Sequence, residues 1–160
     1  MVSVAVAQLL SVRRIAERQK IMNIDLDSKW SNLSGEVNGK RAYIRVNAGL
    51  RPLAGSERYA QELIVSVRLQ QPKDNGLPSD EELVILDDFE DALRPLLQEQ
   101  MESLLAVVMT TDGFRDFIFY TSDMNSAVRR FQTLQPSFGN LQIDVSSKPD
   151  KQWTQYERFS

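Results

Sequence analysis

The chain has 160 residues, 42% of them hydrophobic, and a formal net charge of -3 at pH 7. This length supports one hydrophobic core rather than two domains. The absence of cysteine and histidine excludes disulfides and thiol chemistry, and it removes the commonest zinc ligands and the usual general base. The negative net charge argues against nonspecific nucleic-acid binding, which depends on cations that meet phosphates. We expect a cytoplasmic protein that carries no cofactor.

The first predicted element is an N-terminal segment, residues 1–26, ahead of a single domain at residues 27–160. Its apolar run of about 12 residues is too short to span a bilayer, and its arginines follow the apolar run, unlike those of a signal peptide. Leu9, Val12 and Ala16 fall on one side of a possible helix and Arg14 on another. We expect this helix to dock on the domain or on a second copy in a homodimer; a membrane surface is the less favoured alternative.

A β-hairpin follows, with strands at residues 30–37 and 40–46. The pair Asn38-Gly39 between them is favoured in a tight type I′ turn, because both central residues of that turn need positive φ. A long strand is then predicted at residues 59–70, where Leu63, Val65 and Val67 alternate with polar neighbours.

One densely acidic helix is predicted from Ser79 to about Glu99. Ser79 can cap the first free backbone N–H groups while Glu82 reaches back as a capping box. At about 100 degrees per residue, the apolar side chains share one arc: Leu83, Ile85, Leu86, Phe89, Ala92, Leu93, Leu96 and Leu97. Asp80, Asp87, Asp88 and Asp91 lie opposite, and these four residues are called the acidic face below.

Strands and helices also alternate in the second half of the chain. A strand at residues 104–110 leads through Asp112-Gly113, a second favoured turn pair, into a strand at 114–121. A helix from about residue 124 to 134 and a last strand around Ile143 follow. The order strand, helix, strand, strand, helix, strand is typical of a ferredoxin-like βαββαβ sandwich of the α+β class, which the N-terminal hairpin would extend at one edge. The aromatic tail, with Trp153, is expected to cover apolar surface.

Carboxylates of the acidic helix are the first candidates for chemistry, since hard cations take oxygen ligands. Adjacent helix residues diverge by about 100 degrees, however, so at most two of Asp87, Asp88, Glu90 and Asp91 could share one ion. A solvated acidic face is the favoured interpretation, and no metal ligand is assigned. Glu90 borders the apolar arc, so we expect it to pair with an arginine or lysine of the sheet.

RNA binding is the second candidate, because RNA-recognition domains share this strand order and stack bases on aromatic side chains of one strand. The corresponding strand contains Phe114, Phe117 and Phe119. Their spacing differs from the motif of that family, and Asp112 and Asp116 stand where cations would help. Packing within the core and on the sheet is therefore favoured.

The residues resemble those of a known family. The resemblance extends over roughly residues 27–159 and rests on Gly76-Leu77-Pro78, Glu81-Glu82, Leu86, Phe89 to Leu93, Thr110 to Arg115, Tyr120-Thr121, Asp150, Trp153 and Tyr156. This ordered set is similar to the bacterial domain of unknown function family 695. The resemblance implies a bacterial origin and a fold, and it supplies no catalytic residues. Some members are fused to, or encoded beside, domains similar to ribonuclease E regulator B, which binds its enzyme, and this weakly suggests regulation by protein binding.

We therefore expect a non-enzymatic bacterial domain that recognises another protein, such as a nuclease or a toxin, through Asp80, Asp87, Asp88 and Asp91. A helix face of one sign can steer a basic partner and imitate the charge of nucleic acid. A face that only confers solubility is an equally open interpretation. A carboxylate-dependent metal hydrolase and an RNA-binding domain of the same strand order stay open as alternative functions.

Overall fold

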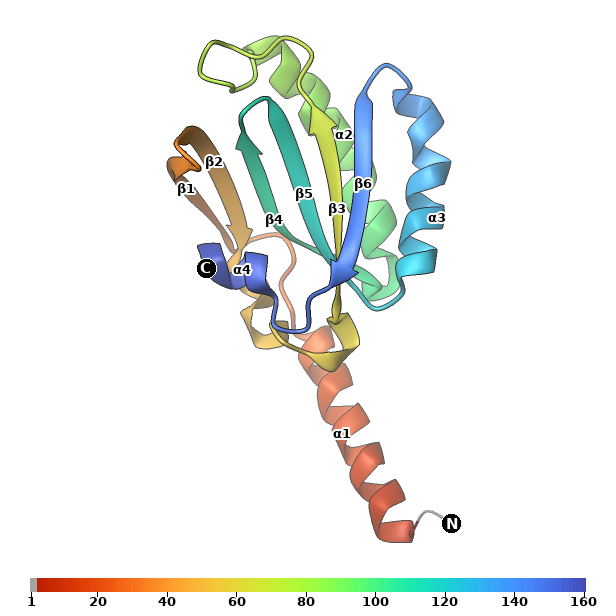
Figure 1. Ribbon diagram of the computed structural model, residues 1–160. Coiled ribbons are helices and arrows are strands. Elements are labelled where there is room, and N and C mark those ends of the chain that lie inside the picture. Colours follow the sequence, from red (N-terminus) through yellow and green to blue (C-terminus); the bar gives the residue numbers. More distant parts are fainter. Residues whose placement is uncertain (1–2) are drawn as a thin grey trace.

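The computed structural model describes residues 3–160, and Met1 and Val2 of the predicted N-terminal segment lie outside them. The described part is an α+β fold built on one six-stranded antiparallel sheet (Figure 1). Its strands are β1 (Trp30–Val37), β2 (Lys40–Asn47), β3 (Gln61–Arg68), β4 (Ser103–Thr111), β5 (Phe114–Thr121) and β6 (Gln142–Pro149). Its α-helices are α1 (Val4–Met22), α2 (Asp80–Gln98), α3 (Met124–Leu134) and α4 (Thr154–Phe159).

The strands lie in the order β1-β2-β4-β5-β3-β6. Both predicted hairpins are confirmed, and their turns have the positive φ angles that the turn pairs require: 51° and 77° at Asn38 and Gly39, and 51° and 83° at Asp112 and Gly113. Strand β2 pairs with β4, so the N-terminal hairpin adds two strands at that edge of the sheet.

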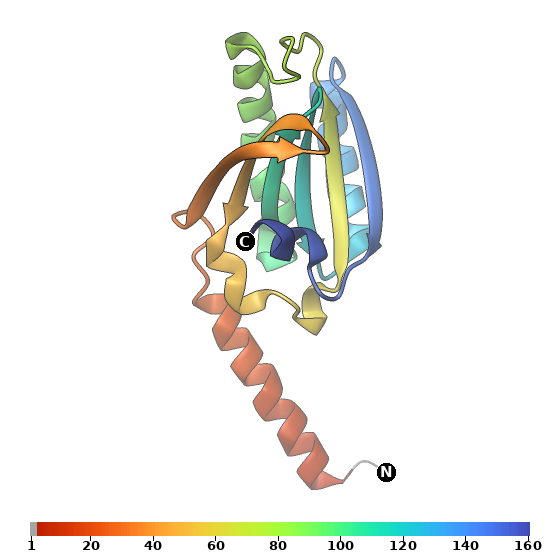
Figure 2. The same cartoon turned by 60° about the vertical axis from the view of Figure 1, so that its left-hand side comes forward.

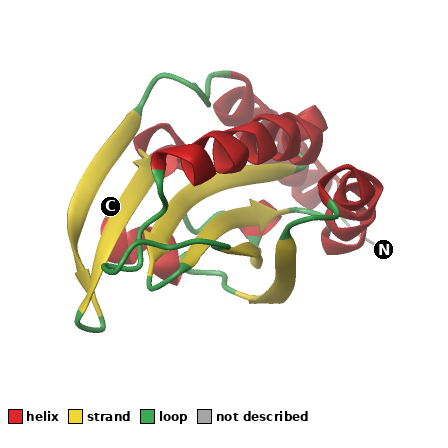
Figure 3. Ribbon diagram, turned by 90° about the horizontal axis from the view of Figure 1, so that it is seen from above, coloured by secondary structure: helices red, strands yellow, loops and turns green. Residues whose placement is uncertain are grey.

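Helices α2 and α3 lie along one face of the sheet (Figures 1 and 3). The alternation of β3 puts Leu63, Val65 and Val67 on this face, where all three are fully buried. Phe89 and Leu93 of α2 are also fully buried in the same cluster. Burial of each such side chain contributes about 1.5 to 3 kcal/mol relative to exposure, so this cluster is what fixes α2 on the sheet.

The opposite face is covered by the C-terminal segment, and the N-terminal hairpin curls over it (Figure 2). Trp153 is fully buried there and stacks on Tyr120, with ring centroids 4.1 Å apart. The indole Nε1 of Trp153 donates to the carbonyl of Tyr59 at 2.8 Å, and the hydroxyl of Tyr156 donates to the carbonyl of Asn47 at 2.8 Å. The expectation that the tail folds back over apolar surface is confirmed.

Trp30, at the start of β1, packs against the cluster on the helix-covered face and is half-buried. Trp30 and Trp153 thus both pack on the sheet, and the two indoles lie against opposite faces.

Helix α1 projects away from the sheet (Figure 1). The hydroxyl of Ser3 caps its first turn, and Leu9 and Val12 are 53% and 62% exposed. The end of the helix joins the domain, because Ile21 is buried and Ile24, just beyond the helix, packs against the same cluster. None of the helices within residues 3–160 is both long and apolar enough to cross a membrane.

The connection before α2 is locked to the turn of the second hairpin. Gly76 has φ of +81° and accepts a hydrogen bond from the N–H of Gly113 at 2.9 Å. A Cβ at Gly76 would lie 3.0 Å from Cα of Asp112. Only glycine meets both conditions without strain, and this contact fixes the position of the segment that leads into α2.

Candidate functional site

The first turn of α2 has the predicted cap but not the complete capping box. The hydroxyl of Ser79 accepts from the N–H of Glu82 at 3.2 Å. The carboxylate of Glu82 does not reach back to Ser79, and instead accepts from the N–H groups of Gln70 and Gln71. These two residues lie beyond the end of β3, where the sheet offers them no partner, so Glu82 ties the connecting segment to the helix.

All four residues of the acidic face are exposed. Between them lies Val84, which is 61% exposed. Asp80 and Asp88 are four residues before and after Val84 and Asp87 is three after, which makes them its neighbours on the helix surface. The acidic face therefore surrounds an exposed apolar side chain.

Ile85 is the one clear error in the predicted apolar arc of α2. It is 37% exposed, because its position is at the margin of the arc, beyond the width of the sheet-facing surface.

One residue of the acidic face differs from the others. Oδ1 of Asp87 lies 3.6 Å from a terminal nitrogen of Arg115. Asp80, Asp88 and Asp91 form no ion pair with any side chain described in residues 3–160. The charge of these three residues is thus available to a partner.

A divalent-metal site was the alternative interpretation of these carboxylates. Within the described residues, no three acidic side chains are arranged so that they could hold a metal ion together. The divergence of adjacent helix positions accounts for this arrangement.

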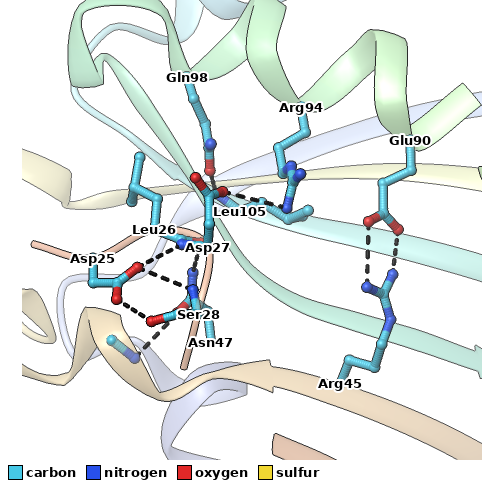
Figure 4. Close-up of polar contacts among 11 residues, drawn as sticks. Asp25, Leu26, Asp27, Ser28, Arg45, Asn47, Glu90, Arg94, Gln98 and Leu105 are labelled. Atoms are coloured by element: carbon cyan, nitrogen blue, oxygen red, sulfur yellow. Dashed lines mark hydrogen bonds and ion pairs between the residues drawn. The ribbon is translucent and has the colours of Figure 1, made fainter. Parts of the chain in front are cut away.

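Glu90 lies on the inner side of α2 and forms a two-pronged ion pair with Arg45 of β2 (Figure 4). The expectation that Glu90 pairs with a cation from the sheet is confirmed. The side chain of Glu90 is 10% exposed and that of Arg45 is 34% exposed. The guanidinium of Arg45 also lies over the ring of Trp30, 5.3 Å from its centroid, so the pair links α2 to both strands of the hairpin.

An ion pair holds the segment between α1 and β1 to this side of the molecule, and hydrogen bonds within the segment form a turn. Arg94 of α2 approaches Asp27 at 3.7 Å (Figure 4). The carboxylate of Asp25 accepts from the hydroxyl of Ser28 and from the N–H groups of Ser28 and Asp27, and these bonds lower the pKa of Asp25 to about 2. Because hydrogen bonding to the charged form favours it, this turn is formed by the ionised carboxylate.

Sequence reasoning did not single out Arg115 as a functional residue. It lies on the helix-covered side of β5 and is 8% exposed, with Nε donating to the hydroxyl of Thr110 at 2.8 Å. Burial lowers the pKa of Arg115, and the nearby Arg45 lowers it further, while Asp87 and Glu90 oppose the shift. The signal was present: Arg115 has the same strand parity as Phe117 and Phe119, which places a cation on the apolar side of the strand.

A second buried polar group lies beneath the C-terminal segment. Asp150 accepts from the hydroxyl of Tyr120 at 3.0 Å and from the N–H and hydroxyl of Thr154 at 2.8 and 2.9 Å. Burial alone would raise the pKa of Asp150, but these hydrogen bonds outweigh burial and lower it. Glu62 of β3 is 1% exposed, with Lys148 3.8 Å away. Burial raises the pKa of Glu62, Lys148 opposes the shift, and Asp150 adds to it.

The three phenylalanines weighed for RNA binding lie on different faces of the sheet. Phe117 and Phe119 are fully buried beneath the helices, whereas Phe114 is on the other face and is 40% exposed. Two of the three rings are therefore unavailable for base stacking in this structure.

These features define the class: an α+β domain with one antiparallel sheet, an outward acidic helix and charged side chains buried between helix and sheet. The chain belongs to the family of unknown function DUF695, whose model matches residues 28–159. Helix α1 lies outside this match. A search of curated proteins found no match.

Proposed function

We propose that this chain is a non-enzymatic binding domain that recognises a basic protein through the acidic face of α2. The observation that carries the proposal is the exposed Val84, surrounded by carboxylates of which three, Asp80, Asp88 and Asp91, form no ion pair with the described residues. Protein interfaces combine an apolar centre with a polar rim, and this surface has both parts. A face that served solubility alone would gain nothing from an exposed valine at its centre.

The charge of this surface indicates the class of partner. Complementary charge speeds association and excludes partners of the wrong sign, while a buried apolar contact slows dissociation. Proteins that bind nucleic acid carry clustered cations for phosphates, and a row of carboxylates can occupy such a cluster. A nuclease or a toxin with a basic active surface fits this description, in line with the regulatory role that the family resemblance suggests.

We propose in addition that the domain is a ferredoxin-like sandwich extended by the N-terminal hairpin. Support comes from the order β4-β5-β3-β6 of the last four strands, their antiparallel pairing, and the placement of α2 and α3 after the first and third of these strands in the chain. A cytoplasmic location and a bacterial origin stay predictions.

The test is affinity capture from native lysate with identification of captured proteins by mass spectrometry. The variant Asp80→Lys/Asp88→Lys/Asp91→Lys reverses three carboxylates that face solvent, and it is expected to lose the captured protein while keeping the wild-type melting temperature. Val84→Asp should lose it as well, because the apolar centre is replaced by a charge. Wild-type capture should weaken between 0.1 and 1 M salt, as the Debye length falls from about 10 Å to about 3 Å.

The matched control is Glu36→Lys/Asp74→Lys/Asp144→Lys, which makes the same charge change at exposed residues outside α2. Equal loss in this control would show that only overall charge matters, and the proposal would be wrong. Capture that survives reversal of the acidic face would also contradict it. A rise in melting temperature with millimolar Mg²⁺, Mn²⁺ or Ca²⁺ would instead favour the metal enzyme, because a ligand that binds only the folded state must stabilise it.

A further inference from the structure

A cavity of about 290 Å³ lies where the N-terminal hairpin meets α2. Its lining combines polar and apolar groups: Asn32, Tyr43, Arg45 and Arg115 with Leu83 and Val108. We call it the hairpin cleft. Small-molecule sites have this character, a mainly apolar pocket with a few polar groups that fix orientation.

Arg115 is the most deeply placed charged group of the hairpin cleft, at 8% exposure. A guanidinium has five N–H donors. One of them is used by Thr110 at 2.8 Å, and the contact of a terminal nitrogen with Asp87, at 3.6 Å, is longer than a hydrogen bond. The terminal nitrogens therefore retain donor capacity in a place that water reaches poorly.

The neighbouring charges differ in how firmly they are held. Both terminal nitrogens of Arg45 are bound by Glu90, so Glu90 balances the charge of Arg45 and leaves it few free donors. The side chain of Asp87 is 67% exposed and can turn into solvent. A ligand that displaces Asp87 then meets the fork of Arg115 directly.

We propose that the hairpin cleft binds a monocarboxylate with a compact apolar body. The carboxylate would accept two parallel hydrogen bonds from the terminal nitrogens of Arg115, the geometry that arginine favours for planar anions. The apolar body would lie against Leu83 and Val108. Two sources share this chemistry: a free small carboxylic acid and the C-terminal residue of a peptide.

The probes are benzoate and its neutral counterpart benzamide, which have the same shape, titrated into the full chain and followed by NMR shifts of the Arg115 Nε–H and by calorimetry. Benzoate is expected to bind and benzamide to bind at least about tenfold more weakly, since only benzoate offers two charged acceptors. A second pair, an acetylated tripeptide ending in phenylalanine as the free acid or as the amide, distinguishes the two sources. Tighter binding of the free-acid peptide than of benzoate assigns a peptide terminus; the reverse assigns a small acid.

Three variants complete the test. Arg115→Lys keeps the charge but loses the fork, and it should weaken benzoate binding at least about tenfold. Asp87→Asn removes the competing carboxylate and should strengthen binding several-fold, and it stays informative if Arg115 variants fail to fold. Arg68→Gln, at an exposed arginine of β3, is the matched control and should bind like the wild type.

Equal affinity for benzoate and benzamide, no binding of any carboxylate, or no effect of Asp87→Asn would each overturn the proposal. These outcomes are separate from those for the acidic face, because Asp80, Asp88 and Asp91 do not line the hairpin cleft. The triple lysine variant should therefore still bind benzoate.

Discussion

Glu62 is a carboxyl group in an unfavourable place, because it is almost completely buried and its Oε2 has no hydrogen-bond partner among the described residues. Lys148, 3.8 Å away, offsets only part of the cost of burying this charge, because its own side chain is 57% exposed. Asp150 stays ionised more readily than Glu62, since its carboxylate accepts three hydrogen bonds. The two acids thus have pKa values displaced in opposite directions.

This displacement predicts a pH dependence of stability. A raised pKa means that folded Glu62 holds a proton more tightly than unfolded Glu62 does. Its contribution is complete below the unfolded pKa, near 4.3, and is lost as pH rises through the folded pKa. We expect the free energy of unfolding of Glu62→Gln to exceed that of the wild type by an amount that grows with pH and then levels off, as measured by urea unfolding between pH 4 and 8. Glu57→Gln, at an exposed site, is the control, and a difference that is constant with pH would contradict this assignment.

Helix α2 has two surfaces with different energetic roles. Its inner surface fills the core with Phe89 and Leu93, while its outer surface carries charge. Phe89→Ala and Leu93→Ala should each lower the free energy of unfolding by about 2 to 5 kcal/mol, the usual cost of a core cavity. Asp88→Asn should change it by less than about 0.5 kcal/mol. Thermal and urea unfolding of the three variants provide the measurement, and similar losses at both surfaces would show that the faces are wrongly assigned.

The ion pair between α2 and β2 permits a separate prediction. Arg45→Ala leaves Glu90 buried without its cation, and we expect a loss of about 1 to 3 kcal/mol. This is below the figure for fully buried pairs, because the Arg45 side chain is 34% exposed. Arg45→Ala/Glu90→Gln should recover part of the loss in urea unfolding, since no unpaired charge is left. No recovery would indicate that packing of Arg45 on Trp30 matters more than its charge.

The elements that the sequence predicts well depend on neighbouring residues. Asn38-Gly39 and Asp112-Gly113 specify their turns locally, Ser79 specifies a helix start, and the alternation in β3 follows from period-two burial. The sequence predicts the charged contacts of the site less completely. Glu90 was expected to find a cation, but the choice of Arg45 depends on pairing between residues 45 positions apart.

Glu62 illustrates the limit of pattern reasoning. Its position in β3 alternates with Leu63 and so predicts exposure, yet the C-terminal segment returns across that face and buries it. The cleft residue Arg115 is similar, because its burial depends on where the N-terminal hairpin lies relative to α2. Such features require the tertiary fold, which no local pattern contains.

On the scale of the whole molecule, α1 and the sheet differ in how they are stabilised. Most helical stability in proteins comes from packing. Among the described side chains of α1, Ile21 joins the core, whereas Leu9, Val12 and Ile15 are exposed. Removal of residues 1–20 should therefore change the free energy of unfolding by less than about 0.5 kcal/mol. Ile21→Ala should cost about 2 kcal/mol or more, as for other buried aliphatic side chains. Urea unfolding of both variants provides the measurement. A large loss of unfolding free energy on removal of residues 1–20 would mean that α1 belongs to the domain.

The C-terminal segment, which covers the sheet face opposite α2 and α3, is synthesised long after the N-terminal hairpin. Asn47, at the end of the N-terminal hairpin, receives its hydrogen bond from Tyr156, which is 109 positions later in the chain. At about 5 to 20 residues per second, a ribosome needs roughly 5 to 20 seconds to make the intervening chain. During that interval Ile44 and Val46, which are buried in the finished protein, have no cover from Trp153 and Tyr156. The nascent hairpin is therefore a surface that a chaperone can bind until translation has delivered its last partners.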